Sequence, residues 1–286
     1  MEKMIKTSQP FITPKAPEIQ YRNELYKLIK AMVKDYKAIT SIYRDKKDQL
    51  AMDADGTWLS TAETAKLESL GAKWSKKFEE FAKDYSPRYV KSILRMSNTQ
   101  IKSVLKDWFA DKRLELFGNV VPVELQQVVK ANTAYNVSLI SSIAPQYHER
   151  VLGSVMRSIS GNGSLKQLSM EIYRYGNMAM RRAKLIAQDQ TRKVYTSVTM
   201  NNCKRLGIHK MRFNHSHAVR EARPLHIRKF NGDYSNYPYV NGLDGLVFDL
   251  DNPPVIQEAK GKTPEVRGYP AQLPFCHCFM SAVLDE

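Results

Sequence analysis

Hydrophobic residues recur at helical spacing near the start of the chain. In "YRNELYKLIKAMVKDYKAITSIYRDKKDQL", apolar positions return every three or four residues with lysines between them, which is typical of an amphipathic helix. The apolar positions are Leu25, Leu28, Ile29, Met32, Tyr36, Ile39 and Tyr43. After the break at "AMDADGTW", Ser60 followed by Glu63 forms a capping box, which predicts a helix through Tyr85.

Helical segments continue through the middle of the chain. Ser97 with Gln100 predicts the start of the next helix, and Gly118 is placed to end it. Pro122 and Pro145 suit the first turns of two further helices, because proline has no amide hydrogen to leave unbonded there. We expect the leucines and aromatic residues of these helices to form a core.

A turn, "GNGS" at 161–164, separates these helices from the next pair. Ser164 with Gln167 predicts the start of the helix "LKQLSMEIYRY". After Gly176 and Asn177 we expect a second, long helix, "MAMRRAKLIAQDQTRKVYTSVTMNNCKRL", ended by Gly207. Its small and branched residues can face a core: Ala183, Ala187, Val194 and Val198.

The pattern changes beyond Gly207. "KMRFNHS" alternates between apolar and polar positions, and "GLVFDL" and "FCHCFMSAV" are also predicted strands, with Pro, Gly, Asn and Asp frequent between them. The sequence therefore predicts an α+β fold, mainly α-helical in its N-terminal and central regions, with a short antiparallel sheet in a small C-terminal domain. We expect three parts: a helical N-terminal region (1–135), a basic helical connector (136–210) and a small α+β domain (211–286).

Composition limits the class of protein. The chain has 286 residues, of which 43% are hydrophobic and 26% charged, as in ordinary globular proteins. It has no apolar run of the roughly 18 residues that a membrane helix needs, no apolar signal-peptide core at the N-terminus, and 3 cysteines rather than a disulfide framework. We expect a soluble protein, made in a reducing compartment, with no membrane contact.

Positive charge is concentrated in the middle of the chain. The formal net charge is +15, and residues 136–212 carry 13 Lys and Arg against 3 Asp and Glu. Such an excess predicts attraction to a polyanion, with double-stranded DNA as the first candidate and a solvated helix face as the alternative. The residues that we expect to contact DNA are Arg150, Arg157, Arg181, Arg182, Lys184, Arg192 and Lys193.

Two of the three cysteines flank a histidine near the end of the chain. In an extended strand, Cys276 and Cys278 point to the same side, and residues at that spacing rarely form a disulfide with each other. One interpretation joins both thiolates with His226 and with His215 or His217 around a structural zinc ion, as a closed tetrahedral site.

The other interpretation makes the cysteines small apolar side chains packed beneath the strand. Arg223 and His226 then anchor their loop through hydrogen bonds. In both interpretations, Arg223, His226, Cys276 and Cys278 form a structural cluster that maintains the fold. Cys203, on the long helix, is most simply a core residue.

The order of these motifs resembles the bacteriophage Mu F-like minor head proteins, a family of phage head-morphogenesis proteins. The resemblance covers roughly residues 136–286. It begins with "IAQDQT" and a Gly-Ile exit from the helix, continues through an HS…RPxH…NG pattern, and ends with PxCxC. The matching residues are Ile186 to Thr191, Gly207, Ile208, His215, Ser216, Ala218, Arg223, Pro224, His226, Asn231, Gly232, Pro274, Cys276 and Cys278.

The resemblance implies a structural role in the virion rather than an enzymatic one. Such a protein would be a minor capsid component that acts in head assembly. It would be present in the host cytoplasm during assembly and inside the capsid, near the portal vertex, in the virion. Its partners would be the portal protein or inner capsid proteins, together with the packaged double-stranded DNA. A purely structural head component without DNA contact is an alternative within this class.

An enzymatic alternative rests on the same C-terminal segment. A histidine-rich loop beside Asp244, Asp249 and Asp251 could bind a divalent metal ion and hydrolyse phosphodiester bonds as a metal-dependent nuclease. These aspartates lie in turn sequences such as "GLDG" and "DLDNPP", however, where aspartate is favoured for backbone reasons. The sequence therefore favours the binding protein over the nuclease.

Overall fold

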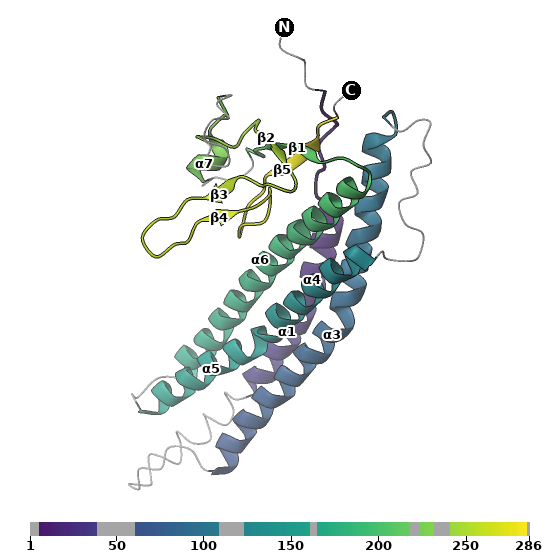
Figure 1. Cartoon of the computed structure of the whole chain (residues 1–286). Coiled ribbons are helices and arrows are strands. Elements are labelled where there is room, and N and C mark those ends of the chain that lie inside the picture. The colour runs from purple at the N-terminus through teal and green to yellow at the C-terminus, as the bar shows by residue number, and fades with distance from the viewer. Residues whose placement is uncertain are drawn as a thin grey trace, which may run out of the picture. The chain divides into compact units, whose positions relative to one another are not determined.

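A computed structural model describes six stretches of the chain, and the structural statements below concern these residues. The stretches are 6–38, 61–108, 123–160, 165–217, 223–231 and 241–284. Long helices occupy most of the first four stretches (Figure 1): α1 (Lys15–Lys37), α3 (Thr61–Leu105), α4 (Val123–Ser141), α5 (Ile143–Ser160) and α6 (Leu165–Arg205). Several predicted helix ends and turns lie outside the described residues: Ser60, Gly118, Pro122, 161–164 and Gly232.

The chain divides into two compact units, whose boundaries fall within α3, α4 and α6 and near the start of α1. The helical unit comprises Glu18–Arg88 and Thr133–Ala187, and the mixed unit comprises Met1–Pro17, Tyr89–Asn132 and Gln188–Glu286. The predicted division into 1–135, 136–210 and 211–286 follows the chain order and stays a prediction.

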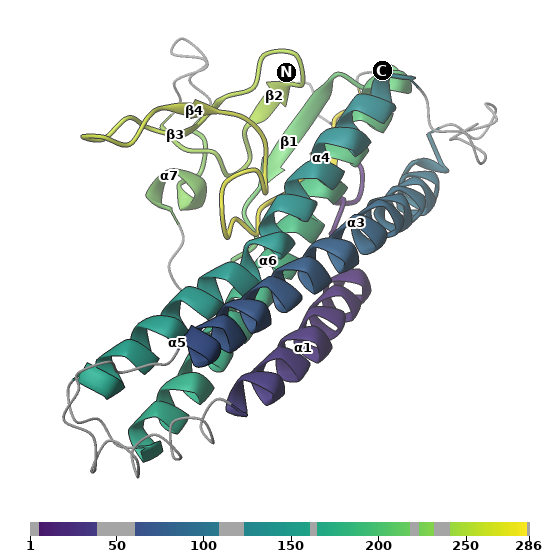
Figure 2. The same ribbon diagram turned by 90° about the horizontal axis from the view of Figure 1, so that it is seen from below.

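The helical unit contains α1, α5, the first part of α3, the end of α4 and the first part of α6, which lie side by side in Figures 1 and 2. The apolar spacing of α1 buries its inner face, including Tyr21 and Tyr36. The Tyr21 hydroxyl donates to Asn136 Oδ1 at 2.8 Å, and the Tyr36 hydroxyl lies 2.8 Å from His148 Nδ1. These bonds provide partners for phenolic groups that the packing removes from water.

Helix α6 is continuous through Gly176 and Asn177, so the predicted break between two helices there is wrong. Gly176 instead allows α6 to approach α1 closely, since a Cβ at this position would lie 2.7 Å from Cγ2 of Val33. A glycine that suggested a helix end in the sequence is thus explained by contact with a distant segment.

Helix α3 is also continuous, across Pro87 and past Ser97 and Gln100, so the predicted helix start at Ser97 is wrong. The Ser97 hydroxyl is buried in the mixed unit and lies 2.8 Å from Oγ1 of Thr199 on α6. Its partner is therefore a neighbouring helix rather than a backbone amide of its own helix. Residues on both sides of Pro87 are buried, such as Phe78 and Val90, although the proline removes one hydrogen bond of the helix.

Two pairs of hydroxyl groups show the direction in which α3 and α6 pack within the mixed unit. Tyr89 bonds Thr191 and Ser97 bonds Thr199, and both pairs are separated by 102 residues. A constant separation means that the two helices run parallel. Asn202 Nδ2 donates to Asn98 Oδ1 at 2.7 Å in the same buried seam.

The C-terminal strands form a small antiparallel sheet. Its order is β2-β1-β5, and a separate hairpin pairs β3 with β4. In the central strand, Met211 and Phe213 point into the core and the residues between them are exposed or half-buried, which is the predicted alternation. The elements are β1 (Lys210–Asn214), α7 (Pro224–Ile227), β2 (Val247–Asp249), β3 (Val255–Gln257), β4 (Val266–Arg267) and β5 (Phe279–Ala282).

The N-terminal segment extends this sheet. The amides of Ser8 and Phe11 donate to the carbonyls of Ala282 and Met280 at 2.8 and 2.9 Å, so residues 7–11 run along the free edge of β5 (Figure 1). The predicted α+β fold, with a helical N-terminal and central region and a small antiparallel sheet, is confirmed. Within the six described stretches, no helix combines the length and the apolar character that a membrane span requires.

Candidate metal centre

The four side chains of the predicted zinc site are buried beside the C-terminal sheet. His215 follows β1, His226 lies in α7, and Cys276 and Cys278 precede β5, each with no more than 6% of its surface exposed. The cysteines therefore lie before the strand, and the prediction that the strand includes them is wrong. Their side chains nevertheless point to one side, because both sulfurs approach the same imidazole nitrogen.

His226, Cys276 and Cys278 form a buried group that could hold a metal ion. One nitrogen and two sulfur atoms lie within 4.8 Å of one another. Nδ1 of His226 is 3.6 Å from Sγ of Cys276 and 3.5 Å from Sγ of Cys278. These donor types are the ones that bind zinc and other soft or borderline metal ions.

A backbone carbonyl orients the His226 ring. Nε2 of His226 lies 2.9 Å from the carbonyl oxygen of Ile256 at the middle of β3. A carbonyl only accepts, so Nε2 carries the hydrogen and, in the neutral ring, Nδ1 presents its lone pair to the two sulfurs. Metal-binding histidines commonly donate their second N–H to a carbonyl in this way. Phe213 packs edge-on against the same ring, with 5.5 Å between ring centroids.

His215 is the candidate for a fourth ligand. Its Nδ1 lies 3.5 Å from Sγ of Cys278, although it is not part of the group whose donor atoms are all within 4.8 Å. Its backbone amide donates to Oδ1 of Asp244 at 2.8 Å, which holds the turn after β1. Burial lowers the pKa of His215, and the neighbouring His217 lowers it further, so the neutral, metal-binding form is favoured. His217 itself is exposed.

The two thiols are electrostatically unequal. A hydrogen bond from Cys278 lowers the pKa of Cys276, and His226 lowers it further, although burial opposes both effects. The same bond and burial raise the pKa of Cys278. One thiolate is thus stabilised in the pair without any ion, and binding a cation would favour loss of the second proton.

The loop that carries the cysteines is held from two sides. A guanidinium nitrogen of Arg223 donates to the carbonyl of Pro274 at 2.9 Å. From α6, Oδ1 of Asp189 accepts from the amide of Phe275 at 3.4 Å, while its other oxygen pairs with Lys193 at 2.8 Å. Phe275 has a left-handed backbone with φ of 59°, so the loop turns sharply just before Cys276.

Asp189 had no assigned role in the sequence, although it lies in the "IAQDQT" stretch of the resemblance. Its carboxylate connects this helix to the cysteine loop. Asp244 was expected only as part of an acidic, nuclease-like stretch, and its contact is with the backbone of His215. The order of the motifs was the available signal for both residues, because no local pattern places either one near the cysteines.

The other two aspartates of the nuclease hypothesis have local partners. Oδ1 of Asp249 accepts from the amide of Asp251 at 2.7 Å, which is a turn contact. Asp251 pairs with Lys204 at 2.6 Å and with His209 at 3.5 Å, and the hydrogen bond from Lys204 is the main cause of its lowered pKa.

The basic residues predicted to contact DNA fall into two groups. Arg150 on α5, and Arg181 and Lys184 on α6, are exposed and have no ion-pair partner among the described residues. Arg181 and Lys184 are three positions apart and therefore share one face of the helix.

The remaining predicted contacts have internal partners. Arg157 lies 3.7 Å from Glu171 and also donates to Ser154 Oγ. Arg182 donates to the hydroxyl of Ser142 at 2.8 Å, and Lys193 pairs with Asp189, as described above. Arg192 is half-buried on α6. Arg157 is nevertheless exposed, whereas Arg182, Arg192 and Lys193 are half-buried and less available to an external polyanion.

Comparison with known proteins gives one informative relative. The chain is 28% identical over 162 residues to an uncharacterized protein of Haemophilus influenzae strain Rd. The aligned part is 57% of this chain and 31% of the relative, so the chain spans about a third of that protein. No protein-family model matches the chain, and no solved structure matches it.

Proposed function

We propose that this chain is a minor head protein of the Mu F-like type, which binds the portal or inner capsid proteins and double-stranded DNA during phage head assembly. The observation that carries the proposal is the meeting of its separate motifs. Asp189 of the helix motif and Arg223 and His226 of the RPxH motif each contact the PxCxC loop, through hydrogen bonds or a sulfur–nitrogen contact. Motifs that form one structural unit support a common family origin better than scattered matches would.

We further propose that the cysteine–histidine group binds a structural zinc ion. Bond lengths of about 2.3 Å for zinc–sulfur and about 2.0–2.1 Å for zinc–nitrogen place neighbouring ligands of a tetrahedral ion about 3.6 Å apart. The sulfur–nitrogen distances to His226 and His215 are 3.5–3.6 Å. A zinc ion would therefore fit between His226, Cys276 and Cys278, and His215 would move closer to complete a tetrahedral site.

The packing interpretation explains the same contacts less well. With Nε2 of His226 bonded to a carbonyl, the neutral ring has a single lone pair at Nδ1, yet two sulfurs approach it within 3.6 Å. One thiol can donate to that lone pair, and the second sulfur then has only the weak thiol–thiol bond to the other cysteine. A cation between the three atoms satisfies all of them.

Metal analysis of the purified protein tests this proposal. We expect about one zinc ion per chain, and loss of the metal in Cys276→Ser/Cys278→Ser. Cys203→Ala is the matched control, because this buried thiol lies on α6 and burial raises its pKa, so it should leave the zinc content unchanged. A native protein with far less than one metal ion per chain would return the cysteines to the packing interpretation.

The proposed DNA contact rests on Arg150, Arg181 and Lys184, which are exposed and form no ion pair with the residues that the structure describes. Phosphate contacts require only lysine or arginine side chains within reach, and they carry no sequence information. Binding should therefore be independent of DNA sequence and steeply dependent on salt.

A gel-shift titration over a range of salt concentrations tests the DNA contact. We expect Arg181→Glu/Lys184→Glu to weaken binding and to reduce the salt slope by about 2, because each phosphate contact contributes about 0.9. Lys91→Glu/Lys102→Glu, on exposed positions of α3, makes the same change of charge and should have a smaller effect. Equal losses in both variants would indicate a general charge effect, and unchanged binding would support a head component without DNA contact.

The binding function and the nuclease alternative predict different products. The aspartates of the nuclease hypothesis bond to backbone amides or to a lysine, which favours the binding function. DNA incubated with the protein and Mg²⁺ or Mn²⁺ should remain intact. Cleavage that His226→Ala abolishes would establish the nuclease instead.

A further inference from the structure

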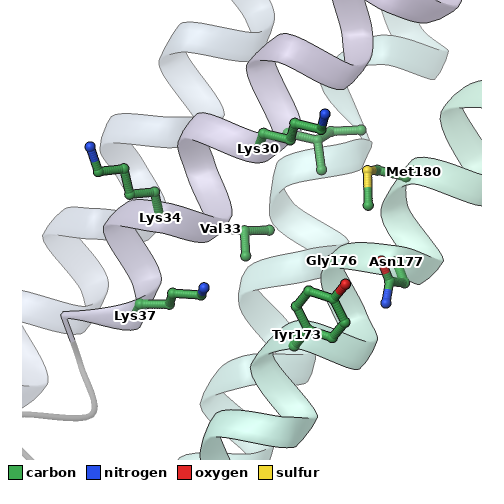
Figure 3. A pocket seen from close by; sticks show the side chains of 9 residues that line it. Lys30, Val33, Lys34, Lys37, Tyr173, Gly176, Asn177 and Met180 are labelled. Carbon is green, nitrogen blue, oxygen red and sulfur yellow. The ribbon is translucent and has the colours of Figure 1, made fainter.

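The helical unit contains a groove that the proposed function does not use. It lies between α1 and α6, has a volume of about 220 Å³, and has Ile29, Val33 and Met180 among its lining residues. Figure 3 shows α1 on one side of the groove and Tyr173, Gly176, Asn177 and Met180 on the other. The close approach of the helices at Gly176 forms the base of this groove.

One wall of the groove is strongly basic. Lys30, Lys34 and Lys37 follow one another at spacings of four and three residues along α1, so they form a row about 10 Å long on one face. All three are exposed, and none of the lining residues that the structure describes is acidic. Lys30 and Lys34 have no ion-pair partner in the described part of the chain. The row therefore favours an occupant with negative charges at matching intervals.

The opposite wall is an apolar stripe at helical spacing. The stripe consists of Tyr173 and Met180, which line the groove, and Met170, which lies beyond the lining residues but on the same face of α6. The polar Asn177 also lines this wall. Met170 is 63% exposed and Tyr173 is 58% exposed, which is unusual for large apolar side chains that repeat along a helix. Aromatic residues and methionine are enriched at protein interfaces, and methionine adapts its shape to a partner.

We propose that this groove binds an acidic, amphipathic helix of a partner protein. The apolar stripe would contact one face of that helix, and the three lysines would pair with Asp or Glu at its i, i+4 and i+7 positions. The volume of about 220 Å³ is below the range of about 300–1,000 Å³ that is typical of small-molecule pockets, but it suits protruding side chains. Nucleic acid is disfavoured as an occupant because the wall that faces the lysines is apolar.

This inference does not depend on the cysteine–histidine group or on DNA binding. Its residues belong to α1 and α6 of the helical unit, and none of them is among the seven predicted DNA contacts. Failure of the metal analysis or of the gel shift would leave it intact, and its own failure would leave the proposed function intact.

Fluorescence anisotropy with designed peptides tests the proposal on the full-length protein. The probe is a labelled 18-residue helical peptide with glutamates at i, i+4 and i+7 and leucines along the adjacent face. We expect binding that Lys30→Glu/Lys34→Glu weakens at least about tenfold, since each changed position replaces an attraction by a repulsion. Lys91→Glu/Lys102→Glu, outside the groove, should change the affinity less than about twofold.

Changing the peptide instead of the protein tests the contribution of each wall to binding. A peptide with serines in place of the leucines, and oligoglutamate without an apolar face, should both bind at least about tenfold more weakly. Equal binding of oligoglutamate would overturn the role of the apolar stripe. Displacement of the peptide by a DNA duplex that also needs Lys30 and Lys34 would assign the surface to nucleic acid. The proposal would be overturned if the original peptide did not bind. It would also be overturned if Lys30→Glu/Lys34→Glu left the affinity for that peptide unchanged.

Discussion

The long helices and the C-terminal segment of this protein are stabilised in different ways. Each long helix repeats its apolar residues over 18 to 45 positions, so each turn adds buried contacts to the same face. The strands of the C-terminal segment are only 2 to 5 residues long. Between these strands lies a buried group of one imidazole and two thiols, with a second imidazole at its edge.

This difference indicates which region depends on a small number of residues. A helical core distributes its stability over many apolar contacts, and the loss of one contact leaves the others in place. A small sheet with short strands has a thin core, and proteins of that kind commonly rely on a metal ion or on disulfides. We therefore expect changes at the cysteine–histidine group to unfold the C-terminal segment while the helical unit remains folded.

The largest effect should follow removal of the metal ligands. Cys276→Ala/Cys278→Ala, or treatment of the native protein with a chelator, should abolish protection of residues 241–284 from hydrogen exchange, because structural zinc contributes about 10–16 kcal/mol of binding free energy in small domains. Protection in α1 and α5 should remain. Mass spectrometry after exchange measures both regions at once. Equal loss of protection in the two regions would contradict the comparison.

A smaller effect is expected in the buried seam between α3 and α6. Asn202→Leu leaves the carbonyl oxygen of Asn98 without its donor and should lower the free energy of unfolding by about 2 kcal/mol. The double variant Asn98→Leu/Asn202→Leu should cost clearly less than the sum of the single changes, because no buried polar partner remains. Urea unfolding of the four proteins in the cycle measures the coupling, and strict additivity would mean that the two side chains act independently.

A close helix contact gives the next prediction. Gly176→Ala should destabilise the helical unit by about 1–3 kcal/mol, because the new methyl group would lie 2.7 Å from Val33. Val33→Ala in the same chain should restore most of the loss.

Gly153→Ala is the matched control, since its Cβ would meet only the flexible end of Arg157 at 3.4 Å. It should stabilise the protein by about 0.5–1 kcal/mol through helix propensity. Thermal unfolding followed by circular dichroism distinguishes these outcomes. A stabilising effect of Gly176→Ala would show that the helices separate without cost.

The smallest effect is a pH dependence within the helical unit. Burial is the main reason that the pKa of His148 is lowered, and its Nδ1 lies 2.8 Å from the Tyr36 hydroxyl. The unfolded chain takes up a proton at this residue near pH 6.5 and the folded chain only at lower pH, so stability should fall as the pH decreases below about 6.5. His148→Phe should reduce this slope. Urea unfolding at pH 5, 6 and 7 compares the two proteins, and an identical slope would exclude His148 as a source.

Local sequence patterns predicted a helix or strand correctly where that element depends mainly on residues of its own segment. Apolar spacing identified α1, and Pro145 lies in the first turn of α5 as expected. The alternation in "KMRFN" identified β1. These signals work because a helix or strand that buries one face must repeat its apolar residues with its own period.

The errors occurred where a residue type has two physical uses. Ser97 has the side chain of a helix cap, but it bonds to a neighbouring helix. Gly176 has the flexibility of a helix end, but it serves a close helix contact. The spacing of Cys276 and Cys278 suggested a strand, but the loop before β5 directs both sulfurs to His226. In each case the partner is distant in the sequence, so no local pattern reveals which use applies.

The sequence by itself determined the fold class, the positions of the main helices and the types of side chain available for a metal centre. These properties follow from periodicity and from the chemistry of single residues. Only the tertiary structure decided that α3 and α6 run parallel, that His215 rather than His217 lies against Cys278, and that Asp189 holds the cysteine loop. Each of these depends on contacts between residues separated by 60 to 102 positions, where packing and burial select the partner.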